Sequence, residues 1–230
     1  MKKKRIAIVP ARAGSVRIKN KNIKDFHGSP LILNCLKQIK KTKLFDKIHV
    51  STDSNKIKNI VKKENIRIDF LRPKKLAGDK ISLNKILKFV LDQYKKQQII
   101  FDEVWLIFAT NPFLTKNIIE KSFKLYKQNK ANYSVITVTK YNYPIEWAMK
   151  INNNLLRYVN PKLAQKDSKK TMNVYCDAGM LVIYQKNFLN RKKLNYKPII
   201  LPISNSVDID NKEDFELAEK LFYANKKKNI

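Results

Sequence analysis

The sequence has few cysteines, few glycines and no long hydrophobic run. Its two cysteines, Cys35 and Cys176, cannot form a disulfide framework and lack metal-ligand spacing, so we interpret both as structural thiols. The 4 glycines form neither a GxGxxG pattern nor a P-loop. Both standard phosphate-binding signatures are therefore excluded.

No stretch approaches the roughly 20 apolar residues that a transmembrane helix needs. The first residues, MKKKRIAIVPARAG, look like the start of a signal peptide, but Pro10 and Arg12 interrupt a short apolar run. We therefore expect a cytoplasmic protein that does not insert into a membrane.

Acidic residues are scarce: 19 Asp and Glu stand against 49 Lys and Arg, a formal net charge of +30. Such a charge is typical of nucleic-acid-binding proteins. The basic residues are mostly lysine, however, and are spread along the chain without an RNP-type motif, zinc-finger spacing or basic region with heptads. We expect small anionic substrates and no nucleic-acid partner, and keep a basic nucleic-acid-binding protein as the alternative from another functional class.

Short β-branched apolar runs alternate with longer amphipathic segments along the chain. With 43% hydrophobic residues, the chain can bury the core of one large domain. The alternation predicts an α/β fold with a mainly parallel sheet and helices on both faces. The expected strands are 5–10, 47–52, 67–71, 103–109, 133–138, 179–184 and 198–203, and the expected helices are 30–41, 54–65, 81–96, 116–129 and 212–224.

Residues 140–174 break this rhythm with a long aromatic and polar stretch that has no helical periodicity. The pattern fits a hairpin with a flexible loop or an arm that leaves the domain. Its apolar residues alternate as they would along one strand: Tyr141, Tyr143, Ile145, Trp147, Met149 and Ile151. Because compact domains rarely carry such a piece without a function, we expect it to have one.

The stretch IAIVPARAGSVRIKNKNI places small and basic residues directly after the first expected strand. The carboxyl edge of an open α/β sheet is where such folds bind ligands. Ser15 adds a hydroxyl donor, and Arg12, Arg17 and Lys21 add positive charge. The loop fits a triphosphate, and equally an ordinary basic turn.

Asp208 and Asp210 alternate along the extended segment SVDIDN, so both carboxylates point to one side. A carboxylate pair of this kind suits Mg²⁺ held jointly with substrate phosphates. Helix capping by Asp210 or Asn211 is the alternative, and it explains one of these residues better than the pair.

Two further loops follow expected strands. Arg72, in FLRPKKLAGD, is an ordinary surface residue by default. Thr110 and Asn111, in FATNPFLT, are placed either to bond a polar ligand or to turn the chain before Pro112.

Taken in order, six motifs carry a family resemblance: IVPARAGS…KNI, LFDKIHVSTDS, FLRPKKLAGD, NPFLT, DAGMLVI and VDIDNKEDFELAE. The set resembles the cytidylyltransferases that activate nonulosonic acids, the CMP-sialic acid synthetase family. FATNPF and YCDAGM resemble the pseudaminic acid branch more than the sialate branch. Val16 stands where the family usually has lysine, which motivates the alternative of a member that binds nucleotide without turnover.

The resemblance implies roles for individual residues. Arg12, Lys21 and Asp210 would be catalytic. Asp208 and Asp210 would bind Mg²⁺, for which Mn²⁺ can substitute. The sugar side would be lined by Thr110, Asn111, Asp177 and Gly179, and CTP would be bound by Ala11, Arg12, Gly14, Ser15, Arg17, Lys21, Asn22, Arg72, Ile81 and Ser82.

The resemblance also implies a three-layer, Rossmann-like nucleotidyltransferase fold and a homodimer. Residues 1–139 and 175–230 would form the nucleotidyltransferase domain, and 140–174 a dimerisation arm inserted in it. The implied reaction transfers CMP from CTP to the anomeric hydroxyl of a nonulosonic acid, pseudaminic acid in this branch. The alternatives within the class are a sialate- or legionaminate-specific relative and a more distant ketodeoxyoctonate cytidylyltransferase.

Overall fold

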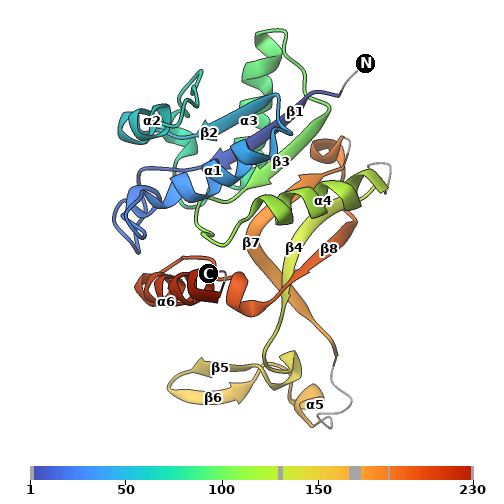
Figure 1. The fold of residues 1–230 in the computed structure, drawn as a ribbon. Coiled ribbons are helices and arrows are strands. Elements are labelled where there is room, and N and C mark those ends of the chain that lie inside the picture. Colours follow the sequence, from blue (N-terminus) through green and yellow to red (C-terminus); the bar gives the residue numbers. More distant parts are fainter. Residues whose placement is uncertain (1–2, 129–131, 166–171, 186, 229–230) are drawn as a thin grey trace.

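The computed structural model describes residues 3–128, 132–165, 172–185 and 187–228. Its centre is a six-stranded sheet in the order β2-β1-β3-β7-β4-β8 (Figure 1). These strands are β1 (Arg5–Pro10), β2 (Lys47–Ser51), β3 (Glu103–Ile107), β4 (Ser134–Lys140), β7 (Tyr175–Tyr184) and β8 (Tyr196–Leu201). Among the described residues, no helix has both the length and the apolar character to cross a membrane.

Helices cover both faces of this sheet, as the sequence predicts (Figure 1). Along β1, Ala7 and Val9 face one side, whereas Ile6 and Ile8 face the other. The first face packs against α1 (Leu31–Thr42), α2 (Asn55–Lys62), α4 (Lys116–Gln128) and α6 (Lys212–Lys228), and the second against α3 (Leu83–Lys96). The α/β class with three layers is confirmed.

The strand directions create a site at one edge of the sheet. β1 pairs in parallel with both β2 and β3, and the chain crosses from β1 to β2 through α1 on one face and to β3 through α3 on the other. The carboxyl ends of β1 and β3 therefore flank a topological switch point, where open α/β sheets bind ligands. Only β7 runs antiparallel within this sheet, because the chain returns from β4 without a crossover helix.

The expected strand at 67–71 is wrong. These residues form no regular secondary structure and join no described strand, and β2 pairs only with β1 among the described strands. Ile66 and Ile68 are buried against the core. Their alternation in the sequence therefore reflects packing on the core and not pairing in a sheet. One backbone bond, from the Arg72 amide to the Thr52 carbonyl at 2.7 Å, ties the end of the segment beside β2.

The stretch 140–174 leaves the domain at the ends of β4 and β7 (Figure 1). It contains a hairpin of β5 (Met149–Asn152) and β6 (Leu155–Tyr158), followed by the short α5 (Pro161–Ala164). Every residue of both hairpin strands is exposed. Residues 166–171 of the expected flexible loop lie outside the described residues.

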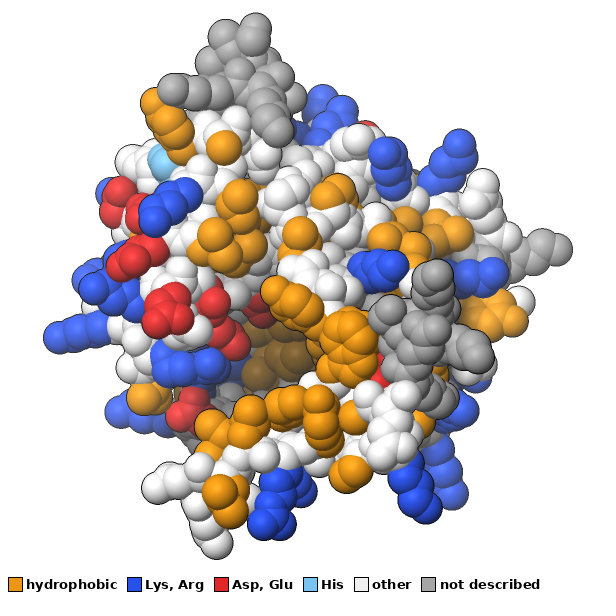
Figure 2. Space-filling view, turned by 90° about the horizontal axis from the view of Figure 1, so that it is seen from below, with side chains coloured by type: hydrophobic (Ala, Val, Ile, Leu, Met, Phe, Trp, Pro, Cys, Tyr) orange, Lys and Arg blue, Asp and Glu red, His pale blue; other side chains and the backbone are white. Residues whose placement is uncertain are grey.

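One expectation for this stretch is wrong: its alternating apolar side chains do not share a single strand. After Pro144, residues Ile145–Trp147 form a turn of 3₁₀ helix, closed by the Trp147 amide on the Pro144 carbonyl at 3.1 Å. Proline fixes its own φ and favours such a turn, so the strand begins only at Met149. The apolar side chains nevertheless remain exposed; Tyr143 is 77% exposed and Ile151 71%. Figure 2, seen from the side of the arm, shows hydrophobic side chains gathered around a hollow.

Candidate active site

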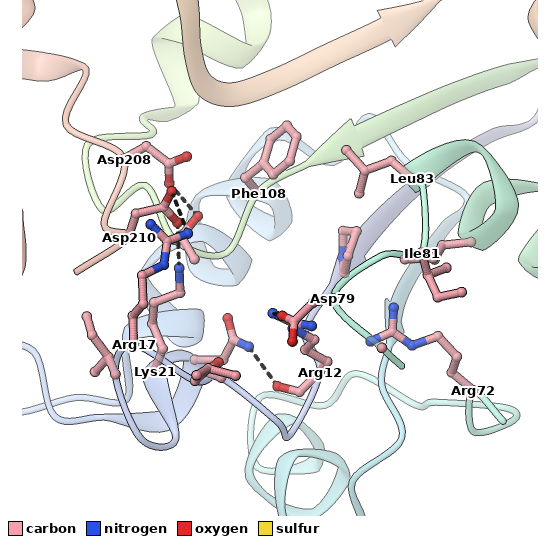
Figure 3. Close-up of a pocket in the computed structure, with 18 residues that line it drawn as sticks. Arg12, Arg17, Lys21, Arg72, Asp79, Ile81, Leu83, Phe108, Asp208 and Asp210 are labelled. Carbon is pink, nitrogen blue, oxygen red and sulfur yellow. Dashed lines mark hydrogen bonds and ion pairs between the residues drawn. The ribbon is translucent and has the colours of Figure 1, made fainter. Parts of the chain in front are cut away.

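A cavity of about 350 Å³ lies at the carboxyl ends of β1 and β3. It collects residues from the loop after β1, the segment before α3, the end of β3 and the turn before α6 (Figure 3). Its lining is Pro10, Arg12, Ser15, Val16, Arg17, Ile18, Lys21, Asn22, Arg72, Gly78, Asp79, Ile81, Leu83, Ile86, Phe108, Thr110, Asp208 and Asp210.

One end of the cavity holds two carboxylates and two cations (Figure 3). Lys21 Nζ donates to Asp210 Oδ1 at 3.1 Å and to the Ile209 carbonyl at 2.6 Å. Arg17 Nη2 donates to Asp210 Oδ2 at 3.2 Å. Thr110 Oγ1 donates to Asp208 Oδ1 at 2.6 Å. The loop after β1 is thus joined directly to the turn before α6.

The two aspartates differ in their readiness to ionise. Burial raises the pKa of Asp208, and the neighbouring Asp210 carboxylate adds to the rise against the Thr110 hydrogen bond. Burial also opposes ionisation of Asp210, but Lys21 and Arg17 outweigh it and lower the pKa of that carboxyl. Asp210 is therefore the more firmly ionised of the pair.

Capping of α6 does not use these two side chains. The Asn211 Oδ1 accepts from the Asp214 amide at 2.9 Å, and Asp214 Oδ2 accepts from the amides of Asn211 and Asp210, each at 2.9 Å. This is a reciprocal capping arrangement. It leaves the carboxylates of Asp208 and Asp210 facing the cavity.

Arg12 lies between the two ends of the cavity (Figure 3). Its guanidinium forms an ion pair with Asp79, which belongs to the segment before α3. The Asn22 amide nitrogen donates to the Arg12 carbonyl at 3.1 Å, so Asn22 holds the loop's backbone. The amide of Ala13 is also committed, because it donates to Asp53 Oδ1 at 2.9 Å.

Arg72 marks the other end of the cavity, on the side of Ile81 (Figure 3). It is only 4% exposed. Its Nε and Nη2 are buried and have no hydrogen-bond partner among the described residues. Burial lowers the pKa of this guanidinium, and the nearby Arg12 lowers it further against the effect of Asp53. A buried cation with unused donors is costly unless a ligand supplies acceptors.

A model of the cytidylyltransferase family matches residues 6–229 of this chain. The chain belongs to that family. A pseudaminic acid cytidylyltransferase from Campylobacter jejuni is 31% identical over 227 residues, which cover 96% of this chain and 97% of that protein. A CMP-N,N'-diacetyllegionaminic acid synthase from Legionella pneumophila is 29% identical over 232 residues, which cover 96% of this chain and 97% of that protein. The resemblance inferred from the motifs is confirmed at the level of the family.

Solved structures support the fold of this cytidylyltransferase. A CMP:2-keto-3-deoxy-manno-octonic acid synthetase complexed with CTP superposes with a TM-score of 0.73 at 14% identity and covers 96% of the present chain. A 4-diphosphocytidyl-2C-methyl-D-erythritol synthase from Anaerococcus prevotii gives a TM-score of 0.59 at 16% identity. The nucleotidyltransferase fold expected from the sequence is therefore confirmed.

Several residues singled out in the sequence lie away from the cavity lining. Ala11 donates its amide to the Ser51 carbonyl at 2.9 Å. Asn111 is fully buried, and its side chain bonds the Ala178 carbonyl and the Phe113 amide at 2.9 and 3.1 Å. This geometry gives Asn111 a structural role, joining the loop after β3 to β7. Gly14, Ser82, Asp177 and Gly179 are also outside the lining.

Gly179 nevertheless contacts the site, because it lies directly behind the Asp208 side chain. It has a φ of +57°, and a Cβ at this position would lie 2.6 Å from Asp208 Cγ. Only glycine therefore lets β7 pass close behind the Asp208 carboxylate. The amide of Gly179 donates to Asp177 Oδ1 at 2.9 Å, which fixes the local bend, and burial raises the pKa of Asp177.

The cavity of the cytidylyltransferase also contains residues that sequence reasoning missed. Phe108, Leu83 and Ile86 supply an apolar wall, and Asp79 supplies the partner of Arg12 (Figure 3). Phe108 and Asp79 stand within the motifs FATNPF and LAGD, so attention to whole motifs could have found them. Leu83 and Ile86 fit the apolar positions of an amphipathic helix, and nothing in the sequence around them indicates that they line a binding site.

The donor set fits a hard divalent cation in one specific way. The described residues contain no group of three or more His, Cys, Asp or Glu side chains able to hold a metal ion alone. Asp208 and Asp210 provide two carboxylates facing one cavity. Mg²⁺ is commonly held by one or two carboxylates together with substrate phosphates and water. The site therefore suits a cation that arrives with a phosphorylated substrate.

Proposed function

We propose that this cytidylyltransferase transfers CMP from CTP to the anomeric hydroxyl of a nonulosonic acid, with pseudaminic acid as the preferred sugar. The anomeric oxygen forms a bond to the α-phosphorus, and the bond from that phosphorus to pyrophosphate breaks. Such a reaction depends mainly on positioning and charge neutralisation.

The observation that carries this proposal is the arrangement of charge along one cavity. At one end stands Arg72, whose buried Nε and Nη2 have no hydrogen-bond partner among the described residues. At the other end stands the cluster of Asp208, Asp210, Lys21 and Arg17. Arg72 has donors for the acceptor atoms of a cytosine base. The cluster has cations for phosphates and carboxylates for a metal. A nucleoside triphosphate has this polarity, with a base at one end and charged phosphates at the other.

The protein's own side chains would bind and orient the triphosphate. Arg12, at mid-cavity, would exchange its ion pair with Asp79 for a bidentate contact with phosphate oxygens. Lys21 and Arg17 must likewise turn from Asp210 toward phosphate oxygens. Arg17 thereby supplies the charge that Val16, the neighbouring exposed residue in the lining, does not.

Asp208 and Asp210 would hold Mg²⁺, or Mn²⁺ in its place. When bound, the ion neutralises phosphate charge and lowers the pKa of the attacking hydroxyl. Thr110 orients Asp208 through its 2.6 Å hydrogen bond, and Gly179 leaves room behind that carboxylate.

The choice of pseudaminic acid rests on sequence. Two pseudaminic acid cytidylyltransferases from Campylobacter jejuni are 31% and 30% identical over nearly the whole chain. The legionaminic acid synthase at 29% makes that sugar the leading alternative, beside the N-acylneuraminate cytidylyltransferase from Escherichia coli at 29%.

We further propose that residues 140–174 form a dimerisation arm. An isolated two-stranded hairpin is marginal in water, and here both faces of β5 and β6 are exposed. A two-fold dimer buries the same patch on both copies. Burial against a second copy would cover the exposed apolar side chains of the arm, with Trp147 and Tyr143 as anchors.

Incubation with CTP, Mg²⁺ and a panel of nonulosonic acids, read as pyrophosphate release, tests the reaction and the sugar together. We expect release that requires both CTP and sugar and is fastest with pseudaminic acid. Faster release with legionaminic or sialic acid would reassign the substrate. CTP binding without release from any sugar of the panel would favour a member that binds nucleotide without turnover.

A further inference from the structure

Arg72 is held in place by an unusual segment. Residues 66–72 join no strand, and the guanidinium of Arg72 has no hydrogen-bond partner for Nε or Nη2 among the described residues. Its position therefore depends on the backbone that carries it. The only anchor at Arg72 itself among the described bonds is its amide on the Thr52 carbonyl at 2.7 Å.

A second anchor lies three residues earlier, at Asp69. Tyr94, on α3, donates its hydroxyl to Asp69 Oδ2 at 2.7 Å. Lys47, at the start of β2, forms an ion pair with the same oxygen, and Arg67 Nε lies 3.3 Å from Oδ1. Burial opposes ionisation of Asp69, but the hydrogen bonds from Lys47 and Tyr94 outweigh it and lower the pKa of Asp69, so the carboxylate is charged.

His49 completes the chain of hydrogen bonds from the other side. It is 1% exposed, and its Nδ1 lies 3.0 Å from the Tyr94 hydroxyl oxygen. Burial lowers the pKa of His49 to about 3, so the ring is neutral. Because the tyrosine hydroxyl donates to Asp69, it accepts from His49, and the Nδ1–H tautomer is assigned.

The ring of Phe70 packs into the same network. Its centroid lies 4.5 Å from that of His49 and 5.2 Å from that of Tyr94. Asp69 and Phe70 are thus clamped between β2 and α3, immediately before the arginine that enters the cavity. Because Arg72 follows Asp69 by only three residues, the anchor at Asp69 limits how far the Arg72 side chain can shift.

We propose that Tyr94 is a positioning residue, which holds Asp69 against His49 and thereby sets Arg72 for the nucleotide. This inference rests on the proposed binding of CTP by Arg72. Tyr94 itself lies outside the cavity lining. Its hydroxyl acts on the ligand only through the segment 69–72.

Tyr94→Phe removes the shared hydroxyl and keeps the ring. We expect the dissociation constant for CTP with Mg²⁺, measured by calorimetry without sugar, to rise roughly tenfold, the scale of one hydrogen bond to a charged group. The turnover number at saturating CTP should stay within about twofold, because Tyr94 touches no reacting atom.

Tyr126→Phe is the matched control. Tyr126 is equally buried on α4, and its hydroxyl donates to the Tyr184 carbonyl at 3.1 Å, away from residues 66–72. Tyr94→Phe loses the two hydrogen bonds of its hydroxyl, to Asp69 and His49, and Tyr126→Phe loses one, so both variants should melt at a lower temperature. Only Tyr94→Phe should weaken the binding of CTP.

Asp69→Asn keeps an acceptor for the Tyr94 hydroxyl and removes the charge, so it should give an intermediate loss of CTP affinity. The proposal is overturned if the dissociation constant of Tyr94→Phe for CTP stays within twofold of the wild-type value. It is also overturned if Tyr126→Phe weakens CTP binding as much as Tyr94→Phe does. Failure of the wild-type protein to bind CTP would instead refute the proposed function.

Discussion

At the scale of single residues, Asp210 has the most demanding role, because it is shared by two cations and is proposed to bind the metal. We predict that Asp210→Ala loses Mn²⁺ binding, measured by electron paramagnetic resonance with CTP present, and that turnover falls to background. The reason is the loss of charge neutralisation at the phosphates. Mn²⁺ binding of wild-type strength in Asp210→Ala would remove Asp210 from the metal site.

Asp214→Ala is the control for this variant. Asp214 stands in the first turn of α6, four residues after Asp210. Its side chain caps the helix and does not line the cavity. Its loss should lower the free energy of unfolding by about 1 kcal/mol and leave metal binding unchanged.

Gly179 gives a second prediction at this scale. In Gly179→Ala the new methyl group would overlap Asp208, so that carboxylate must move and turnover should fall at least about tenfold. Gly28→Ala controls for backbone strain, because Gly28 also has a positive φ, +79°, but open space around its Cβ position. Equal losses of turnover in the two variants would show that strain, and not contact with Asp208, is responsible.

At the scale of elements, burial of His49 on β2 makes stability depend on pH. The folded protein keeps this ring neutral down to about pH 3, whereas an unfolded histidine takes up a proton near 6.5. The unfolded state therefore binds more protons below pH 6.5, and stability falls as the pH is lowered toward 3. Between pH 7 and pH 5 this group should cost about 2 kcal/mol.

Urea unfolding of the wild type and of His49→Gln at both pH values measures that contribution. The variant is less stable at pH 7 but should lose less stability between pH 7 and pH 5, by about 2 kcal/mol. Parallel losses in the two proteins would mean that His49 is protonated in the folded state.

Most elements of this fold could be predicted from the sequence, because amphipathic helices and buried strands have different periods. The exception at 67–71 is instructive: Ile66 and Ile68 pack against the core, and no local signal distinguishes an irregular segment packed on the core from a paired strand. The irregular pattern of residues 140–174 indicates a stretch that leaves the domain, but Pro144 interrupts the single strand that its alternating side chains suggest.

The gathering of candidate residues at one cavity could be predicted where those residues stand in loops at the ends of strands. Arg12, Lys21, Asp208 and Asp210 stand in loops after strands or before a helix, and all reach one cavity. The Arg12–Asp79 pair joins residues 67 positions apart, and the contact of Gly179 with Asp208 depends on a fold-level approach. No sequence pattern reveals such pairings before the fold is known.

At the scale of the whole molecule, the exposed arm predicts association. We expect light scattering at micromolar concentration to give the mass of a dimer. Replacing Tyr143 and Trp147, which are 77% and 41% exposed, by serine should produce monomers or aggregates. Tyr223→Ser, at an exposed aromatic residue on α6, is the control. It tests whether loss of any exposed aromatic side chain is enough to disrupt the dimer. A stable, active wild-type monomer would contradict the arm proposal.

The central claim is the transfer of CMP from CTP to a sugar acid, and labelled CTP tests it most directly. With CTP carrying the label on its α-phosphorus, incubation with Mg²⁺ and pseudaminic acid should move the label into a CMP–sugar identified by mass spectrometry. CTP labelled on its γ-phosphorus should release all label as pyrophosphate. Label from the α-phosphorus that stays in CTP or appears in free CMP alone, across the whole panel of nonulosonic acids, would contradict the account.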